Sequence, residues 1–357
     1  MSETITIALG FEPLDVLFFR DGKPFEAGIR ASTIEPLPQT LAGAIRTHAL
    51  QAAGCDFDRL GADIGNGNGF AEALKLQSPP LAAAAELICR GPWFAQDGAP
   101  LLPMPASLHR PKRADGGFIR LDPWPASPPG WRAPMPGMRP LLATSRERIE
   151  RAEGWLTLQG IHAFLQGNVP KQDQSVARDA LFDIDSRTGI VIEPETWTTK
   201  ESLIYLADYL ALKPGVSLYA EITGPAACLD QAFPPGGTLT LPLGGQGRRV
   251  CVTRGAPVAW PERPSGAGKR LLLLTCPALF NGGWHPQRLS PVAAAVPGHV
   301  AFSGWDLARR GPKPTRFAAA AGSVFFFDTP PHIDRHSLCD DADDRLIGWG
   351  SYLEGIW

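Results

Sequence analysis

The chain opens with a regular alternation of apolar and small or polar positions. Every second residue from Ile5 to Phe11 is apolar, which is the period of a strand with one buried face. The spacing then becomes helical between residues 36 and 54, where prolines precede the apolar positions and Gly54 ends the run. The sequence therefore predicts a strand followed by a helix that begins near Thr40.

Apolar runs bounded by turn residues predict more strands than helices in the rest of the chain. Residues 146–167 are predicted to be partly helical, and 180–193 are predicted to form two paired strands around a turn at Ser186–Gly189. Further strands are predicted at 217–224, at 238–253 as two strands around a glycine loop, at 269–275 and at 323–328.

This order of elements predicts an α+β protein with two sheet-based domains, because helices are few after the opening strands and helix. We place the domains at residues 1–225 and 226–357. The first domain carries a proline-rich insertion at about 79–140, which holds 14 of the 36 prolines. A proline density of that kind predicts a long irregular segment.

Composition narrows the class of protein. With 357 residues, 44% hydrophobic residues and 20% charged residues, the chain is too apolar to be disordered. A net charge of −2 argues against a protein that coats nucleic acid without selectivity, so any such contact is expected at local basic clusters, which occur at 110–113, 248–249, 263–270 and 309–316.

The cellular compartment follows from the cysteines and the apolar stretches. The six cysteines are scattered without a C-x-x-C pair, which is typical of a reduced cytosolic protein. The first ten residues contain an acid and no basic segment, unlike a signal peptide, and the apolar stretch 271–280 is too short to span a bilayer. We expect a cytoplasmic protein with no membrane contact.

The segment 18–25 combines aromatic and basic residues at the end of a predicted strand. Phe19 can stack on a base, and Arg20 and Lys23 can neutralise phosphates. The alternative is that the aromatic rings belong to the core and the cations are solvated. The following helix start, with Thr40, Gly43 and Arg46, can also receive a phosphate at its unpaired N–H groups, although every helix has such an end.

The glycine loop 243–249 is more informative. Gly244, Gly245 and Gly247 can let backbone amides approach a phosphate, and Arg248 and Arg249 add positive charge. The loop matches neither a P-loop nor G-x-G-x-x-G. A tight hairpin turn with glycines at positive φ is an equally good interpretation.

Two enzymatic alternatives stay open. His48 lies on an early helix and could act as the base of a metal-independent endoribonuclease, although its place on the apolar face favours a packed side chain. His332, His336 and Cys339 could hold zinc in a hydrolase, but a fourth ligand is not evident.

Taken in order, these segments resemble the Cmr subunit three family of type III-B CRISPR effector complexes, which belongs to the RAMP superfamily. The resemblance covers nearly the whole chain apart from the insertion. The motifs that carry it are PLDVLFFRDGKPFEAG (13–28), TLAGAIR (40–46), DIDSRTGIVIE (183–193), SLYAEI (217–222), LGGQGRR (243–249), NGGWHP (281–286), SGWDLARRGPKPTR (303–316), AGSVFFFD (321–328) and GWGSYLEGIW (348–357).

The resemblance implies two tandem ferredoxin-like (RRM-related) domains with an insertion. It implies an antiviral-defence subunit that binds the repeat-derived 5′ tag of the CRISPR RNA and docks on the large polymerase-like subunit and a backbone RAMP subunit. It further implies that this chain needs no cofactor or metal, performs no catalysis, and meets target RNA only indirectly.

The same resemblance implies which residues contact RNA. Gln246 departs slightly from the pattern, because an acid is as common at that position. The residues implied are Phe19, Arg20, Lys23, Arg30, Thr40, Gly43, Arg46, Arg187, Thr188, Gly189, Ile190, Gly244, Gly245, Gln246, Gly247, Arg248 and Arg249.

Overall fold

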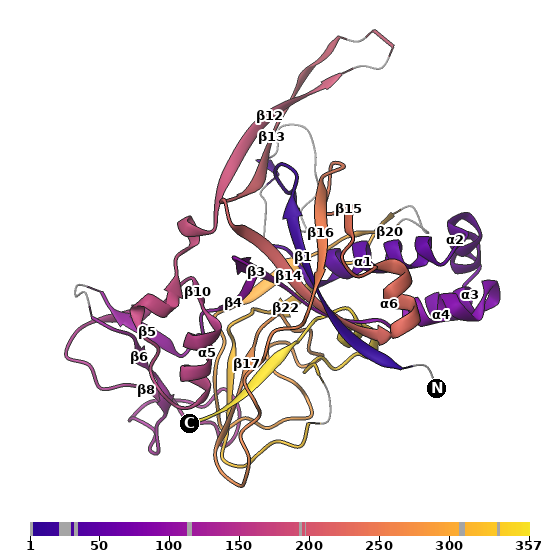
Figure 1. Ribbon diagram of the computed structural model, residues 1–357. Helices are drawn as coiled ribbons and strands as arrows, with labels where there is room; N and C mark the ends of the chain where they lie inside the picture. The colour runs from indigo at the N-terminus through magenta and orange to yellow at the C-terminus, as the bar shows by residue number, and fades with distance from the viewer. Residues whose placement is uncertain are drawn as a thin grey trace. The chain divides into compact units, whose positions relative to one another are not determined.

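The computed structural model shows a chain that divides into two compact units, each built from several stretches of sequence (Figure 1). Unit 1 comprises Met1–Pro92, Leu181–Pro257 and Ala301–Arg316, and unit 2 comprises Trp93–Ala180, Val258–Val300 and Phe317–Trp357. The residues that the structure describes are 3–20, 30–31, 35–112, 116–192, 195–196, 198–306, 311–333 and 336–357.

Strand β1 (Thr4–Pro13) forms the centre of the sheet in unit 1. It pairs antiparallel with β14 (Val216–Pro225) on one side and with β16 (Arg249–Gly255) on the other. The edge strand β15 (Thr238–Pro242) pairs with β16, and the first half of β3 (Ile88–Gln96) lies next to β14. Ile7, Leu9 and Phe11 are buried, as the alternation of β1 predicts.

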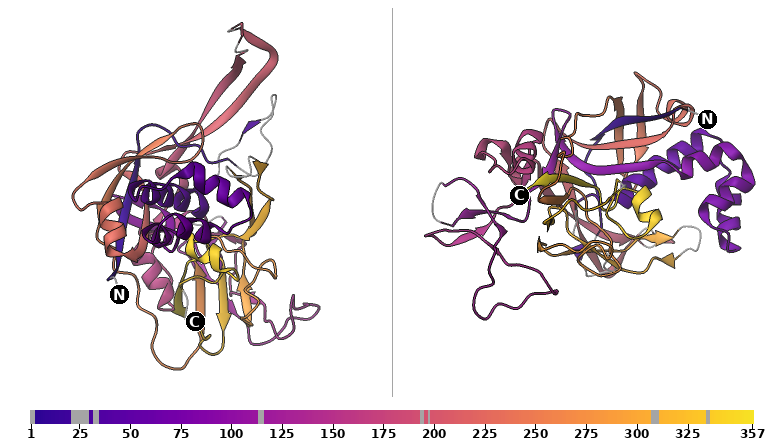
Figure 2. Two further views of the ribbon diagram at one scale, coloured as in Figure 1. Left: turned by 90° about the vertical axis from the view of Figure 1, so that its right-hand side faces the viewer. Right: turned by 90° about the horizontal axis from the view of Figure 1, so that it is seen from below.

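Helix α1 (Pro38–Ala52) buries Leu41 and Ile45, in agreement with the predicted helix. Proline at its start fits, because the first helical N–H has no partner within the helix. It contacts α4 and α6, and these two helices contact β14 (Figure 2). The other helices of unit 1 are α2 (Phe57–Gly65), α3 (Phe70–Gln77), α4 (Pro79–Ala85) and α6 (Ala226–Ala232).

A second sheet of unit 1 is a long hairpin of β12 (Phe182–Ile192) and β13 (Thr199–Leu212), to which β2 (Arg30–Ala31) adds in parallel. The predicted turn at Ser186–Gly189 is wrong. Those residues lie in the middle of β12 and pair in unbroken register with β13, because regular pairing from residue 182 to residue 190 overrides the local turn tendency of Ser and Gly. Unit 1 also contains β20 (Trp305–Asp306) and β21 (Gly311–Pro312).

The main sheet of unit 2 is antiparallel, in the order β18 (Ala293–Ala295), β23 (Val324–Phe327), β17 (Arg270–Leu274), β24 (Tyr352–Ile356). Residues 271–274 and 324–326 are fully buried, as expected for the two apolar runs. Helix α5 (Leu158–Leu165) packs on β24. Residues 146–167 are partly helical, as predicted, and the helix lies in the second half of that range.

The remaining elements are short. In unit 2 they are β4 (Ala99–Pro103), β5 (Leu108–Pro111), β6 (Ile119–Arg120), β7 (Asp122–Pro123), β8 (Leu141–Leu142), β9 (Ile149–Arg151), β10 (Trp155–Leu156), β11 (Ser175–Val176), α7 (Ala342–Leu346) and the 3-10 turns Gln172–Gln174 and Arg178–Ala180. The chain passes between units within β19 (His299–Phe302) and β22 (Arg316–Ala319).

The expected irregular insertion at 79–140 is wrong for its first part. Residues 79–103 contain α4, β3 and β4, and Trp93 and Leu102 are buried. Prolines are tolerated there because Pro79 and Pro80 start a helix, where no N–H is needed. Only from residue 104 onward is the segment made of loops and very short strands.

The compact units differ from the two consecutive domains placed at 1–225 and 226–357. Strands β15 and β16 follow residue 225, yet β16 pairs directly with β1, so both belong to unit 1. In the described part of the chain, no helix has the length and apolar character required to cross a membrane.

The contact between β24 and α5 yields a test of packing in unit 2. A Cβ atom at Gly355 would lie 2.7 Å from both the Cα and the carbonyl oxygen of Leu165 in α5. Overpacking of this kind costs about 1–3 kcal/mol, so we expect Gly355→Ala to lower the melting temperature by roughly 3–10 °C.

The matched control is Gly255→Ala at the end of β16, where a Cβ meets no atom within 4 Å. Differential scanning fluorimetry of the two variants checks this expectation. Equal melting temperatures for both variants would contradict the close approach of α5 and β24.

Candidate nucleic-acid interface

The glycine loop is a tight turn that joins β15 and β16. Gln246 and Gly247 have positive φ angles of 54° and 66°, and the N–H of Arg248 donates to the carbonyl oxygen of Gly245 at 3.3 Å. Two central residues at positive φ define a type I′ hairpin turn. The turn is therefore fixed by backbone geometry, as the hairpin interpretation expected.

Gly244 and Gly245 are needed because the loop packs against the backbone at Phe18. A Cβ at residue 244 would lie 2.5 Å from the carbonyl oxygen of Phe18, and one at residue 245 would lie 2.9 Å from the Phe18 ring. The N–H of Gly245 donates to that same carbonyl at 2.8 Å. This N–H is therefore occupied within the protein, whereas a Cβ at Gly247 would meet nothing within 4 Å.

Tyr209 on β13 lies at the centre of the cluster that this packing creates. Its ring centroid is 5.2 Å from that of Phe18, and its hydroxyl donates to the side-chain oxygen of Gln246. The guanidinium carbons of Arg187 and Arg248 lie 5.0 and 4.6 Å from the ring centroid. Since the ring is only 5% exposed, it supports the two arginines and is not itself a surface for base stacking.

Two carboxylates neutralise these arginines. Asp15 accepts from Arg248 at 2.8 Å and from Arg187 at 3.5 Å, and Asp185 lies 2.7 Å from Arg187. Desolvation by burial raises the pKa of the Asp15 carboxyl. The hydrogen bond from Arg187 and the positive charges of Arg187 and Arg248 have a larger, opposite effect, so the pKa lies below its ordinary value. Asp15 is therefore charged at neutral pH.

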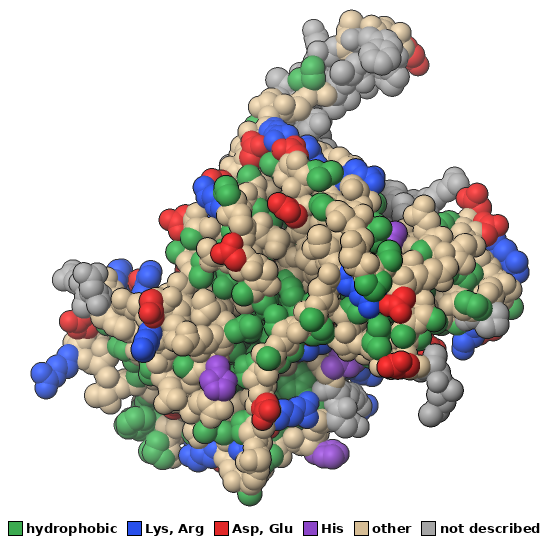
Figure 3. All heavy atoms as spheres, in the orientation of Figure 1, with side chains coloured by type: hydrophobic (Ala, Val, Ile, Leu, Met, Phe, Trp, Pro, Cys, Tyr) green, Lys and Arg blue, Asp and Glu red, His purple; other side chains and the backbone are tan. Residues whose placement is uncertain are grey.

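We call Asp15, Asp185, Arg187, Tyr209, Gln246 and Arg248 the Tyr209 cluster. The cluster joins the motif at residues 13–28, the β12–β13 hairpin and the glycine loop 243–249, which lie far apart in the sequence. On the face drawn in Figure 3, basic and acidic side chains are intermixed next to the β12–β13 hairpin. Arg187, Gln246 and Arg248 were predicted as RNA contacts from motifs, whereas Asp15, Asp185 and Tyr209 were not.

Only part of the motif at residues 13–28 is exposed and so available to contact RNA. Phe19 is 4% exposed, so its ring is not presented to a base, and the predicted stacking role at that position is not supported. Arg20 is exposed. Lys23 lies outside the described residues, and for Arg30 the backbone alone is described, as part of β2.

The start of α1 presents Gly43 to solvent, and a Cβ there would meet nothing within 4 Å. Thr40 lies in the first turn of this helix, and no side chain caps the helix. Arg46, by contrast, donates to the carbonyl oxygen of Leu87 at 2.9 Å. Its guanidinium therefore ties α1 to the start of β3, which is a structural role.

Successive residues of β12 point to opposite faces of the hairpin. Arg187 shares its face with Asp185, whereas Thr188 and Ile190 lie on the other face and are exposed. Gly189 pairs with Tyr205 of β13. Arg249 is also exposed, and its guanidinium donates to the carbonyl oxygen of Thr240 at 3.1 Å.

His48 is half-buried and packs against neighbouring residues, as its place on the apolar face of the helix favours. Its Nε2 lies 2.8 Å from the carbonyl oxygen of Ala232, and its ring lies against Phe233 at 5.2 Å between centroids. A base for RNA cleavage must reach the ribose hydroxyl, and this nitrogen already has a partner.

The proposed zinc ligands are also used in packing. Cys339 is buried, it accepts the N–H of Leu279 at 3.2 Å, and burial raises the pKa of its thiol to about 12. His336 contacts the carbonyl oxygen of Arg345 at 2.9 Å. Among the described residues, no group of three His, Cys, Asp or Glu side chains has the arrangement of a metal site.

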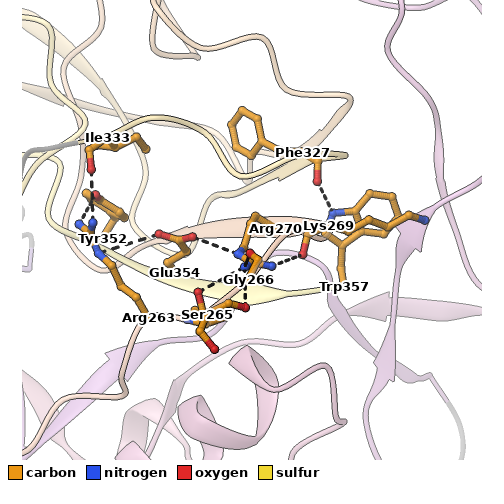
Figure 4. A network of polar contacts seen from close by, with 11 residues as sticks. Arg263, Ser265, Gly266, Lys269, Arg270, Phe327, Ile333, Tyr352, Glu354 and Trp357 are labelled. Atoms are coloured by element: carbon orange, nitrogen blue, oxygen red, sulfur yellow. Dashed lines mark hydrogen bonds and ion pairs between the residues drawn. The ribbon is translucent and has the colours of Figure 1, made fainter.

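The basic cluster 263–270 is a structural network of unit 2 (Figure 4). The side chain of Arg270 is 4% exposed, pairs with Glu354 at 3.3 Å and donates to carbonyl oxygens of residues 264–266. Arg263 donates to the hydroxyl of Tyr352 at 2.8 Å, and the Nζ of Lys269 lies 4.0 Å from the centroid of the Trp357 ring. Arg270 is therefore a buried structural residue, whereas Arg263 and Lys269 keep exposed side chains.

A search of the curated proteins found no match. Among solved structures, the chain resembles one described as "Cryo-EM structure of the Type III-B Cmr-beta bound to cognate target RNA", with 16% identity, a TM-score of 0.51, and coverage of 89% of this chain and 86% of the other.

A second structure, of the same Cmr-beta assembly bound to cognate target RNA and AMPPnP, matches with 17% identity, a TM-score of 0.50 and the same coverage. At these identities the likeness concerns the fold. The family described as CRISPR-associated protein (Cas_Cmr3) matches residues 9–357. Because that match spans nearly the whole sequence, the chain belongs to the Cmr3 family of CRISPR-associated proteins.

Proposed function

We propose that this chain is a non-catalytic, RNA-binding subunit of a type III CRISPR effector complex that acts in antiviral defence. It binds the repeat-derived 5′ tag of the CRISPR RNA and docks the large polymerase-like subunit onto a backbone RAMP subunit. Target RNA is met only indirectly. Family membership across residues 9–357 supports the assignment to this kind of complex.

The strand order of unit 1 supports descent from a ferredoxin-like fold. The order β3–β14–β1–β16, with α1 between β1 and β3 and α6 between β14 and β16, follows the β-α-β-β-α-β pattern. In RRM domains a sheet of this kind carries single-stranded RNA. We propose that the two units derive from tandem ferredoxin-like domains, with β12–β13 added to the first.

The Tyr209 cluster is the observation that carries the RNA-binding role. Single-stranded RNA is held by cations that neutralise its phosphates, and guanidinium groups do so with two parallel hydrogen bonds. Arg187 and Arg248 are held in place by one ring and remain 41% and 22% exposed, so both can reach a phosphate. Arg20, Arg249 and the exposed face of β12 extend the proposed contact.

The contacts of His48 support a binding role over RNA cleavage by this chain. A nucleolytic site requires a base that is free to take a proton from the substrate. His48 is instead held between Ala232 and Phe233 in unit 1.

The two arginines of the Tyr209 cluster can be tested by substitution. We expect Arg187→Ala with Arg248→Ala to weaken binding of RNA that carries the repeat-derived 5′ sequence. For single-stranded RNA, each lost phosphate contact reduces the magnitude of the slope of log K (the association constant) against log salt concentration by about 0.7. The slope of the double variant should therefore be smaller in magnitude by about 0.7–1.4. Fluorescence anisotropy over a salt series measures both quantities.

The control is Lys75→Ala, which removes an exposed cation on α3. This helix packs against α2 and α4 and contains no residue of the Tyr209 cluster. The salt slope of the control should equal that of the unchanged protein. If the double variant and the control had the same slope, the Tyr209 cluster would not be a phosphate contact.

The role of His48 can be tested by substitution too. We expect the full chain to leave repeat RNA intact in EDTA, and His48→Ala to change nothing in that assay. The variant loses a hydrogen bond worth about 1 kcal/mol, so its melting temperature should fall by roughly 2–4 °C. Cleavage in EDTA that disappears in His48→Ala would show that this chain is a nuclease.

A further inference from the structure

One oxygen of Asp15 accepts hydrogen bonds from both arginines of the Tyr209 cluster. The same Oδ2 lies 2.8 Å from Nη1 of Arg248 and 3.5 Å from Nη1 of Arg187. This is the arrangement in which a phosphate oxygen would be held by two guanidinium groups. Asp15 therefore occupies a position suited to an anion.

The arginines do not need Asp15 to keep their places. Each guanidinium lies over the Tyr209 ring, and Arg187 is held in addition by Asp185, with Nε and Nη2 at 2.8 and 2.7 Å. An aromatic face attracts a guanidinium without using its outward N–H donors. If the Asp15 carboxylate moved away, Arg187 and Arg248 would stay side by side with only the Asp185 carboxylate to balance their two positive charges.

Asp15 is able to move away. It lies two residues beyond the end of β1, and its side chain is 55% exposed. Among the described residues its ion pairs are with Arg187 and Arg248, and the backbone N–H of Val16 also donates to its carboxylate. Ion pairs this exposed contribute little to stability, because water screens them and the side chains lose freedom in forming them. By contrast, the Tyr209 ring beneath the arginines is buried and fixed.

We propose that Asp15 marks a phosphate subsite, in which one phosphate of the bound RNA displaces the Asp15 carboxylate and takes its place between Arg187 and Arg248. This inference rests on the proposed RNA-binding function and adds to it the ligand group, the two residues that hold it and the residue that competes with it. In the free protein Asp15 satisfies the arginines, so RNA binding must overcome that competition.

The test is Asp15→Asn, which removes the competing charge and keeps the side-chain shape. We expect this full-length variant to bind RNA with the repeat-derived 5′ sequence about two- to fivefold more tightly, the change that weak surface ion pairs allow. Anisotropy measures the affinity of the single chain. The RNA retained through a salt wash measures the same effect in the complex purified from the host.

The matched control is Asp183→Asn, on the same face of β12, whose carboxylate pairs with Lys213 and not with Arg187 or Arg248. It removes the same charge outside the subsite, so its effect should be small. Asp15→Ser provides a second variant without the charge. An equal gain from Asp183→Asn would mean that only net charge matters, and would overturn the inference.

A third measurement separates this inference from the proposed function. In the Arg187→Ala and Arg248→Ala background, Asp15→Asn should have no effect, because nothing remains for which it competes. If the arginine variants weaken binding but neither Asp15 variant strengthens it, the subsite is wrong and the RNA-binding role stands. If the arginine variants bind RNA normally, the role of the cluster itself is wrong.

Discussion

The hydrogen bond from the N–H of Gly245 to the carbonyl oxygen of Phe18 is the contact on which the candidate interface depends. It holds the β15–β16 turn against the segment that follows β1, and it leaves no room for a side chain at Gly244 or Gly245. Because the turn is fixed there, Gln246 and Arg248 reach Tyr209 on β13. Three segments that are distant in sequence thus meet around one aromatic ring.

Local patterns were sufficient to predict the elements with strong periodicity. The alternation of β1, the helical spacing of α1, and the apolar runs of β17 and β23 were all correct, because burial of one face or of the whole element determines such sequences. The predicted turn within β12 was wrong, since Ser and Gly also occur in a strand whose partner pairs with the residues on both sides of them.

The site was harder to predict than the fold, because the partner of each side chain is set by tertiary contact. Arg187 and Arg248 were named from motifs. Asp15 also lies in a quoted motif (13–28), but nothing in the sequence joins it or Tyr209 to those two arginines. Conversely, Arg46 and Arg270 are basic in sequence and satisfy carbonyl oxygens inside the protein. A run of Arg and Lys residues in the sequence therefore indicates a basic surface only if those side chains do not donate to carbonyl oxygens inside the protein.

The alternation of the chain between the two units has a consequence for protein synthesis. Unit 1 takes its last strands from 301–316, after the chain has already supplied two stretches to unit 2. A domain made from one continuous segment can fold as soon as that segment leaves the ribosome. Here, neither unit can be completed until nearly the whole chain has been translated, and β1 gains its partners β14 and β16 only once residues 216–255 have been made.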